Sequence, residues 1–288
     1  MSTVRALLLS SRPLSWVNTA YPFAVAYLLV AGGIDLAWVI GTIYFLVPYN
    51  LAMYGINDVF DYESDLRNPR KGGVEGALLD RRFHRTTLWA VLITNLPFLV
   101  ALVVLGSALS WVVLAVSVFA VIAYSAPVLR FKERPFLDSL TSSTHFVSPA
   151  VYGLALAGGA FDAKAWMILG AFFLWGMASH AFGAVQDITA DREGGIGSIA
   201  TVIGAAPTVK LSVLLYVAAG VLLALTGPPA AWAAVLALPY AVSILPWWSV
   251  READAESANR GWKRFLWLNY ATGALVTMLI IATVTFGL

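Results

Sequence analysis

The chain has 288 residues, of which 60% are hydrophobic and only 12% are charged. This composition excludes an ordinary water-soluble fold and predicts an integral membrane protein. The chain contains no cysteine, which excludes disulfides and thiolate metal ligands. The formal net charge is +2 and no nucleic-acid-binding motif is present, so we expect membrane lipid and no nucleic acid as a partner.

Long apolar runs follow one another along the chain. An α-helix needs roughly 17 to 25 apolar residues to cross a bilayer. Runs of this kind lie near 14–32, 37–56, 87–106, 110–126, 138–158, 165–186, 208–226, 230–249 and 265–287. Backbone groups in lipid must bond within their own segment, and these runs are too long for strands. The sequence therefore predicts an all-α integral membrane protein with nine transmembrane helices, forming one domain over residues 1–288.

The distribution of basic residues predicts the orientation. With nine spans, the side of the membrane that holds the N-terminus also holds the loops 57–86, 127–137, 187–207 and 250–264. Of the 18 Lys and Arg residues, all but Lys164 fall on that side. The positive-inside rule therefore predicts a plasma-membrane protein with a cytoplasmic N-terminus, cytoplasmic loops at these four positions and an external C-terminus.

Acidic clusters stand at the ends of two of these apolar runs. The first set contains Asn57, Asp58, Asp61 and Asp65, and the second set contains Asp187 and Asp191. On a continuing helix, the spacing within each set places its carboxylates on one face. Hard cations such as Mg²⁺ take oxygen ligands and often bridge carboxylates to substrate phosphates. We expect these six residues to bind Mg²⁺, and the simpler alternative is a solvated acidic loop.

Basic residues follow the first acidic set and continue in the next loop on the same side. Those placed nearest the acids are Arg67, Arg70, Lys71, Arg130 and Lys132. Arginine forms bidentate bonds with phosphate oxygens and lysine supplies a compact charge, so these residues are expected to bind a diphosphate. The alternative is that they follow the positive-inside rule or contact anionic lipid headgroups. We prefer that alternative for Arg81, Arg82, Arg85, Arg251 and Arg264.

Polar and aromatic residues also occur within the spans. Polar groups are costly against lipid, so they are expected to face the interior of the bundle. Some aromatic rings would line a cavity and stabilise a carbocation, while most form interfacial belts or packing. Candidates for an acceptor cavity are Asn18, Asn50, Tyr54, Phe146 and Trp175. His145 and His180 are interpreted as hydrogen-bonding residues between helices and are not assigned to catalysis.

The two acidic sets resemble the N-D-x-x-D-x-x-x-D and D-x-x-x-D motifs of the UbiA superfamily of intramembrane prenyltransferases, which bind Mg²⁺ and an isoprenyl diphosphate. Both motifs are intact in this sequence. The segment that carries Tyr124, Arg130 and Lys132 is similar to the basic, tyrosine-containing loop that cups the diphosphate in that family. The resemblance implies a UbiA-type helical bundle with a central cavity open to the cytoplasmic side.

A closer resemblance concerns four stretches, 11–22, 54–65, 68–76 and 131–136, which look like bacterial lycopene elongases. It implies Mg²⁺-dependent transfer of a C5 group from dimethylallyl diphosphate to the ends of lycopene, giving C45 and C50 carotenoids. The catalytic residues implied are Asp58, Asp61, Asp187 and Asp191. They would hold Mg²⁺ against the diphosphate as the C–O bond ionises to an allylic cation.

Other functions stay open from the sequence. A UbiA-type enzyme could act on a quinone precursor or another lipid acceptor, although no cation suited to an aromatic carboxylate stands out within the spans. An ion-coupled transporter would place its ionisable groups near the bilayer midplane, whereas these acids lie at span ends. A need for a partner subunit of a carotenoid pathway is also undecided.

Overall fold

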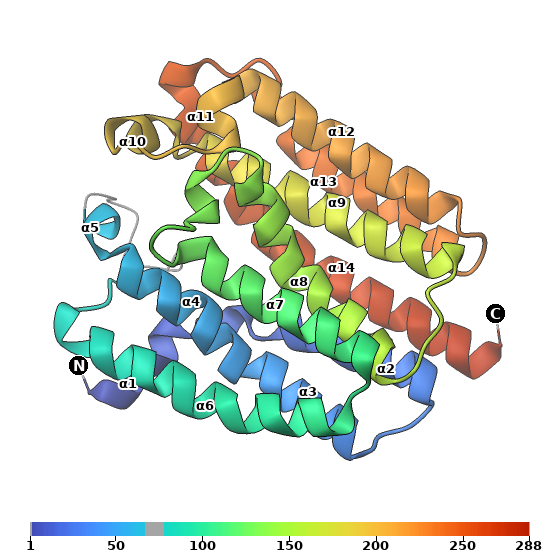
Figure 1. Cartoon of the computed structure of the whole chain (residues 1–288). Coiled ribbons are helices and arrows are strands. Elements are labelled where there is room, and N and C mark those ends of the chain that lie inside the picture. Colours follow the sequence, from blue (N-terminus) through green and yellow to red (C-terminus); the bar gives the residue numbers. More distant parts are fainter. Residues whose placement is uncertain (1, 67–77, 288) are drawn as a thin grey trace. The chain divides into compact units, whose positions relative to one another are not determined.

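The computed structural model describes residues 2–66 and 78–287, and all regular secondary structure within them is helical (Figure 1). The predicted all-α class is therefore confirmed. The chain divides into two compact units. Unit 1 comprises Met1–Phe131 and Thr144–Ala160, and unit 2 comprises Lys132–Ser143 and Phe161–Leu288. The interpretation of residues 1–288 as one domain stays a prediction.

Unit 1 is built from the helices of the N-terminal half of the chain. They are α1 (Thr3–Ser10), η1 (Pro13–Ser15), α2 (Val17–Ala31), α3 (Leu36–Leu46), α4 (Pro48–Phe60), α5 (Tyr62–Asp65), η2 (Arg81–Phe83), α6 (His84–Leu105), α7 (Ala108–Ser125) and the later part of α8 (Leu137–Leu156). Capping residues set the connection between α2 and α3. Gly32, at φ 70°, ends α2 in the left-handed conformation, and the Asp35 carboxylate accepts the Trp38 N–H at the start of α3.

The run expected as one span at 37–56 is one candidate span, Leu36–Phe60, which is interrupted between the helices α3 and α4. Pro48 has no N–H, and its ring disfavours a continuous helix, so the chain is interrupted at Val47. The fully buried Asn50 amide donates to the carbonyl of Phe45 at 2.8 Å and to that of Leu46 at 3.1 Å. It also donates to the Thr19 hydroxyl at 2.7 Å. Asn50 therefore ties α4 to the end of α3 and to α2.

Phe23 of α2 lies at the centre of the unit 1 core. Its ring is 5.2 Å from that of Phe45 and 5.9 Å from that of Tyr152, measured between centroids. A Cβ at Gly41 would lie 2.0 Å from the Phe23 ring, and one at Gly153 would lie 2.6 Å from the Phe23 carbonyl oxygen. Glycine at these two positions therefore lets α3 and α8 approach α2 closely.

Unit 2 contains the first turns of α8 and the C-terminal helices. They are α9 (Ala163–Val185), α10 (Ile188–Glu193), α11 (Ile199–Ile203), α12 (Ala205–Ala224), η4 (Ala230–Leu236), α13 (Ala237–Ile244), η5 (Leu245–Trp247), η6 (Glu252–Ala258) and α14 (Asn259–Phe286), and the short η3 (Phe131–Glu133) joins the two units in sequence. The core packs α9 against α12, with Phe182, Tyr216 and Trp247 buried in it. Within α14 only Gly261 is buried, beneath the Phe182 ring.

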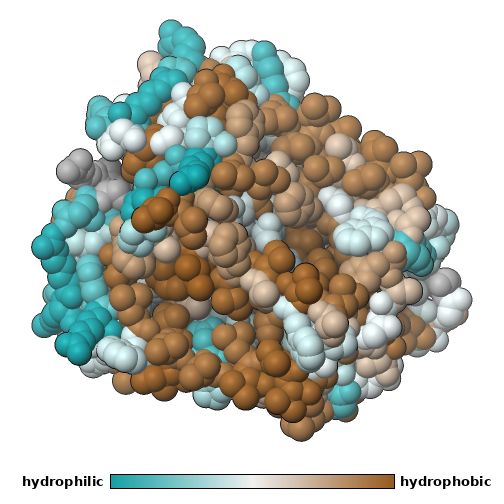
Figure 2. Space-filling model, viewed as in Figure 1, coloured by the Kyte–Doolittle hydropathy of each residue, from teal (hydrophilic) through white to brown (hydrophobic). Residues whose placement is uncertain are grey.

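The described residues contain seven helices long and apolar enough to cross a membrane, or eight if the bent pair Thr3–Ser15 and Val17–Ala31 is one span. The chain is therefore a multi-pass membrane protein. Hydrophobic residues cover much of the face drawn in Figure 2. The expected count of nine is not reached because α8, predicted at 138–158, forms a helix but is too polar to qualify. Its buried polar residues are Asp138, Ser139, Thr141, Ser143, His145 and Ser148.

Candidate active site

The first acidic set lies where α4 ends and α5 begins. Asn57 and Asp58 belong to the last turn of α4, Asp61 is its C-cap residue, and Asp65 closes α5. The helix is interrupted at Asp61, but helical bonds persist across the break, since the N–H of Asp61 donates to Asn57 and that of Asp65 donates to Asp61. As whole residues, Asp58, Asp61 and Asp65 are 1%, 4% and 7% exposed. They are therefore buried, as a solvated acidic loop would not be.

Ser10, the last residue of α1, and Arg12, the N-cap residue of η1, both bond to Asp58. The Ser10 hydroxyl donates to Asp58 Oδ2 at 2.8 Å, and Arg12 Nη2 donates to Asp58 Oδ1 at 3.1 Å. The guanidinium also lies 4.3 Å above the Tyr54 ring, and the Arg12 backbone is left-handed, with φ 50°. From the sequence, Arg12 is counted only among the basic residues of the expected cytoplasmic side, yet its guanidinium forms an ion pair with Asp58. Its position immediately before Pro13 is a sequence signal that the first helix ends nearby, because proline disfavours the α conformation in the residue before it.

The end of α7 and the loop after it also contact the first acidic set within unit 1. Asn57 Nδ2 donates to the Ser125 hydroxyl at 3.0 Å, and Arg130 Nη2 lies 3.7 Å from Asp61 Oδ1. Val128 and Arg130 have positive φ values of 76° and 39°, and such strain in non-glycine residues clusters at functional sites. The structure thus brings the predicted diphosphate ligand Arg130 beside a predicted metal ligand.

Other predicted diphosphate ligands have different positions. Arg67, Arg70 and Lys71 lie outside the described residues. Tyr124, in the last turn of α7, makes an edge contact with the buried His145 ring, at 5.1 Å between centroids. Lys132 begins unit 2 in sequence, and its ammonium lies 4.0 Å from the Glu133 carboxylate.

The second acidic set is carried by the short helix α10. Asp187 is the N-cap residue of α10 and Asp191 lies one turn later, with its N–H donating to the Asp187 carbonyl at 2.8 Å. Both side chains are half-buried. The preceding residue, Gln186, accepts a 2.6 Å bond from Asn259 at the start of α14. The predicted helical spacing of the two carboxylates is therefore present within unit 2.

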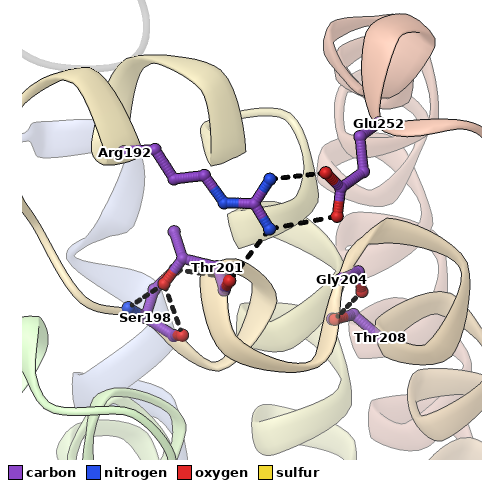
Figure 3. A network of polar contacts seen from close by, with 6 residues as sticks. All are labelled: Arg192, Ser198, Thr201, Gly204, Thr208 and Glu252. Atoms are coloured by element: carbon purple, nitrogen blue, oxygen red, sulfur yellow. Dashed lines mark hydrogen bonds and ion pairs between the residues drawn. The ribbon is translucent and has the colours of Figure 1, made fainter.

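A polar network surrounds the end of α10 (Figure 3). Both terminal nitrogens of Arg192 bond to the Glu252 carboxylate, and Nη2 also donates to the Thr201 carbonyl at 3.0 Å. Ser198 and Thr201 cap α11 reciprocally. The predicted set contained neither Arg192 nor Glu252, because the 60 residues that separate them hide the pair from local pattern reading.

The loop that carries Lys132 is joined to the chain that follows the second acidic set, within unit 2. Asp138 is fully buried and accepts the N–H of Ser139 and the N–H of Ile199, each at 2.8 Å. A Cβ at Gly197 would lie 2.8 Å from the Glu133 carbonyl oxygen, so the two backbones approach closely there. His180 lies against the same region, 3.1 Å from the Ser139 hydroxyl.

The chemistry of the first acidic set suits a magnesium ion. Within residues 2–66 and 78–287, no three His, Asp or Glu side chains lie together in one metal-binding group. The three buried carboxylates of the first set nevertheless offer only oxygen ligands, which Mg²⁺ prefers. Burying carboxylates is costly unless positive charge compensates them. Arg12 and Arg130 supply part of that compensation, and a divalent cation would add to it.

The predicted acceptor residues are spread over both units. In unit 1, Asn50 bonds to α2 and α3, and the Tyr54 ring makes a cation–π contact with the Arg12 guanidinium. Asn18 and Phe146 are half-buried. In unit 2, Trp175 packs in an aromatic cluster with Phe172, Tyr240 and Phe265. Their role as acceptor contacts stays a prediction.

Curated relatives are similar to the chain over almost its whole length. It is 58% identical over 282 residues to the "Lycopene elongase/hydratase" of Corynebacterium glutamicum, and the match covers 98% of both chains. It is 59% identical over 276 residues to the "C(50) beta-cyclic carotenoids biosynthesis protein LbtBC" of Dietzia sp.. That match covers 96% of this chain and 64% of the Dietzia protein.

The fold also matches a solved structure, a UbiA homologue from Archaeoglobus fulgidus bound to DMAPP and Mg²⁺. The TM-score is 0.69 at 18% sequence identity, and the match covers 92% of this chain and 98% of the other, a likeness of fold alone. The family model described as "UbiA prenyltransferase family" matches residues 19–283, which include both acidic sets. The chain therefore belongs to the UbiA prenyltransferase family and is a membrane-embedded prenyltransferase.

Proposed function

We propose that this prenyltransferase moves dimethylallyl groups from dimethylallyl diphosphate to the ends of lycopene, giving C45 and C50 carotenoids. The observation that carries the proposal is the 58% identity, over 98% of both chains, to a lycopene elongase/hydratase. Similarity of this extent along the whole chain favours the same class of acceptor over a quinone precursor or another lipid.

The residues of the two acidic sets would hold the metal. They are Asn57, Asp58, Asp61, Asp65, Asp187 and Asp191. Of these, Asp58, Asp61, Asp187 and Asp191 are proposed as catalytic. When bound, Mg²⁺ supplies positive charge that stabilises the leaving diphosphate. The burial of the first set supports this role, because carboxylates out of water bind cations more strongly than solvated ones.

Basic residues and one tyrosine would bind the diphosphate oxygens. They are Arg67, Arg70, Lys71, Tyr124, Arg130 and Lys132. Arg130 has the best geometric support, because its guanidinium already lies beside Asp61 and its five N–H donors can serve a carboxylate and a phosphate together.

The reaction would begin with heterolysis of the allylic C–O bond, whose electron pair leaves with the diphosphate. A terminal alkene of lycopene then forms a new C–C bond with the allylic cation. The resulting tertiary cation loses a proton or captures water. Asn18, Asn50, Tyr54, Phe146 and Trp175 are proposed to line the acceptor cavity, where aromatic faces stabilise positive charge and exclude water.

The proposed enzyme is one domain of nine spanning helices, with a central cavity open to the cytoplasm. The N-terminus and the loops with both acidic sets would be cytoplasmic and the C-terminus external, in the plasma membrane. The bias of basic residues supports this orientation. The length of α8 supports the ninth span, since 20 residues at about 1.5 Å each give roughly 30 Å, the thickness of the hydrocarbon core.

The test is chromatography with mass spectrometry of pigments from a lycopene-producing bacterial host that expresses the chain. We expect new carotenoids heavier by one and two C5 units, and added oxygen would show that water is captured. Asp58→Ala and Asp187→Ala should abolish these products at normal membrane insertion, while Asp254→Ala, which removes an exposed carboxylate, should not. Unaltered lycopene with well-inserted wild-type protein would contradict the proposed acceptor, and activity in either motif variant would contradict the proposed metal ligands.

A further inference from the structure

Arg192 is the residue that immediately follows Asp191, so the simplest expectation is that it binds substrate phosphate. In unit 2, however, the Arg192 guanidinium bonds to other protein groups. Both terminal nitrogens face the two oxygens of Glu252, and Nη2 also reaches the Thr201 carbonyl (Figure 3). An arginine held by a bidentate carboxylate and a backbone carbonyl is fixed in direction as well as in charge.

The partners of Arg192 are themselves held rigidly. Glu252 Oε1 would lie 3.1 Å from a Cβ at Gly204, so the carboxylate rests against the backbone of that residue. Gly204 has φ 86°, a conformation that disfavours any side chain, and its carbonyl accepts the Thr208 hydroxyl at 2.7 Å. The network therefore joins α10, the ends of α11 and α12, and η6 at one point.

The position of α10 depends on such tertiary contacts. It has only six residues, and a helix of that length is not stable alone in water. It packs against η6, and the chain after it is fixed at Ile199 by the buried Asp138. Between these points, the bonds of Arg192 to Glu252 and Thr201 form a charged link that helps to hold the helix bearing Asp191.

The charge balance at Arg192 also argues against a role as a phosphate ligand. Glu252 already compensates the guanidinium, since both of its carboxylate oxygens accept hydrogen bonds from the terminal nitrogens of Arg192, at 2.5 and 3.0 Å. Exposed ion pairs contribute little to the overall stability of a protein. The bidentate pair of Arg192 and Glu252 is therefore better explained by its effect on the position of α10, which carries Asp191.

We propose that Arg192 is a positioning residue that orients Asp191 through its bonds to Glu252 and Thr201, and that it is not a diphosphate ligand. This inference rests on the proposed role of the second acidic set in binding Mg²⁺ and diphosphate. Residues that orient metal ligands commonly change metal affinity or activity by about 10- to 100-fold when they are replaced.

The test is a charge-reversal cycle with Arg192→Glu, Glu252→Arg and the double variant, purified in detergent. Two quantities are measured: the Mg²⁺ concentration for half-maximal turnover, and Mn²⁺ binding with dimethylallyl diphosphate present, followed by electron paramagnetic resonance. We expect each single variant to weaken both by roughly tenfold or more. The double variant should recover part of both losses, because the reversed pair restores the ion pair but not the bond to the Thr201 carbonyl. Arg251→Gln, which removes an exposed pair with Asp254 at the start of η6, should leave both unchanged.

Each outcome has one meaning. A double variant as poor as Arg192→Glu, or a Glu252→Arg variant equal to wild type, would overturn the inference and place Arg192 on the substrate. Recovery of Mn²⁺ binding in the double variant supports it, even if wild-type protein forms no prenylated carotenoid. In that case the positioning role stands and the proposed acceptor fails.

Discussion

At the scale of single residues, Asp58 shows how a buried carboxylate is prepared for a ligand. It is 1% exposed and is held by Ser10 and Arg12, which come from a segment 46 and more residues earlier in the chain. Arg12 in turn rests on the Tyr54 ring. This arrangement neutralises Asp58 without a metal, and it fixes the carboxylate before any ligand arrives.

Replacing Arg12 should therefore change how the protein responds to metal. Arg12→Gln removes the charged hydrogen bond to a carboxylate that has no solvent to replace it, and we expect the metal-free protein to lose about 1 to 3 kcal/mol of stability. Magnesium with dimethylallyl diphosphate should then raise the melting temperature of the variant by more than that of wild type, because the cation restores the lost compensation. Thermal unfolding with and without these ligands measures both effects.

Ser10→Ala is the matched control for that experiment. It removes the other bond to Asp58 but leaves its charge partner in place. We expect a smaller loss of stability and a ligand-induced shift close to wild type. Equal ligand-induced shifts in Arg12→Gln and wild type would show that Arg12 does not compensate the metal site.

At the scale of elements, the junction of α3 and α4 shows a polar side chain used to stabilise a break in an apolar run. Asn50 sits two residues after Pro48 and donates to two carbonyls of α3 and to Thr19. Its full burial means that no water can take over these bonds. The junction is therefore a defined interruption of the helix, with its own hydrogen bonds.

Asn50→Ala should destabilise the protein by about 1 to 3 kcal/mol, because buried acceptors lose their donor and a small cavity is formed. Unfolding in mixed detergent micelles, followed by circular dichroism, gives the free-energy difference. Thr94→Ala is the control, since its hydroxyl bonds only within the turn of α6. If both variants unfold alike, Asn50 does not stabilise the junction.

The sequence predicts these elements to different degrees. The helices and the two acidic sets follow from periodicity and spacing, which are local properties. The Pro48 break was missed because hydropathy continues across it, and the polar α8 was counted as a span because apolar residues separate its serines. Arg12 and the pair of Arg192 with Glu252 could not be predicted, because long-range contacts leave no local signature.

At the scale of the whole molecule, the distribution of charge is the feature most directly open to test. All basic residues but Lys164 are expected on one side of the membrane, and the chain has no native cysteine to interfere with labelling. In whole cells, a membrane-impermeant maleimide should therefore label Lys164→Cys and should label Asp254→Cys only after lysis. Both positions are exposed. The reverse pattern would place the acidic sets outside the cell.

The packing of the last helix, α14, determines how freely its sequence can vary. Gly261 is the one buried residue of α14, and the exposed Leu275, Met278 and Ile281 farther along the helix are not confined to a particular shape by close packing. Selection there acts on hydropathy, and Leu, Ile, Val and Met are interchangeable as long as the segment stays apolar. In α9, where Gly176 leaves room for the Ser143 side chain, selection acts on volume instead. Over evolutionary time α14 should therefore drift in sequence faster than α9.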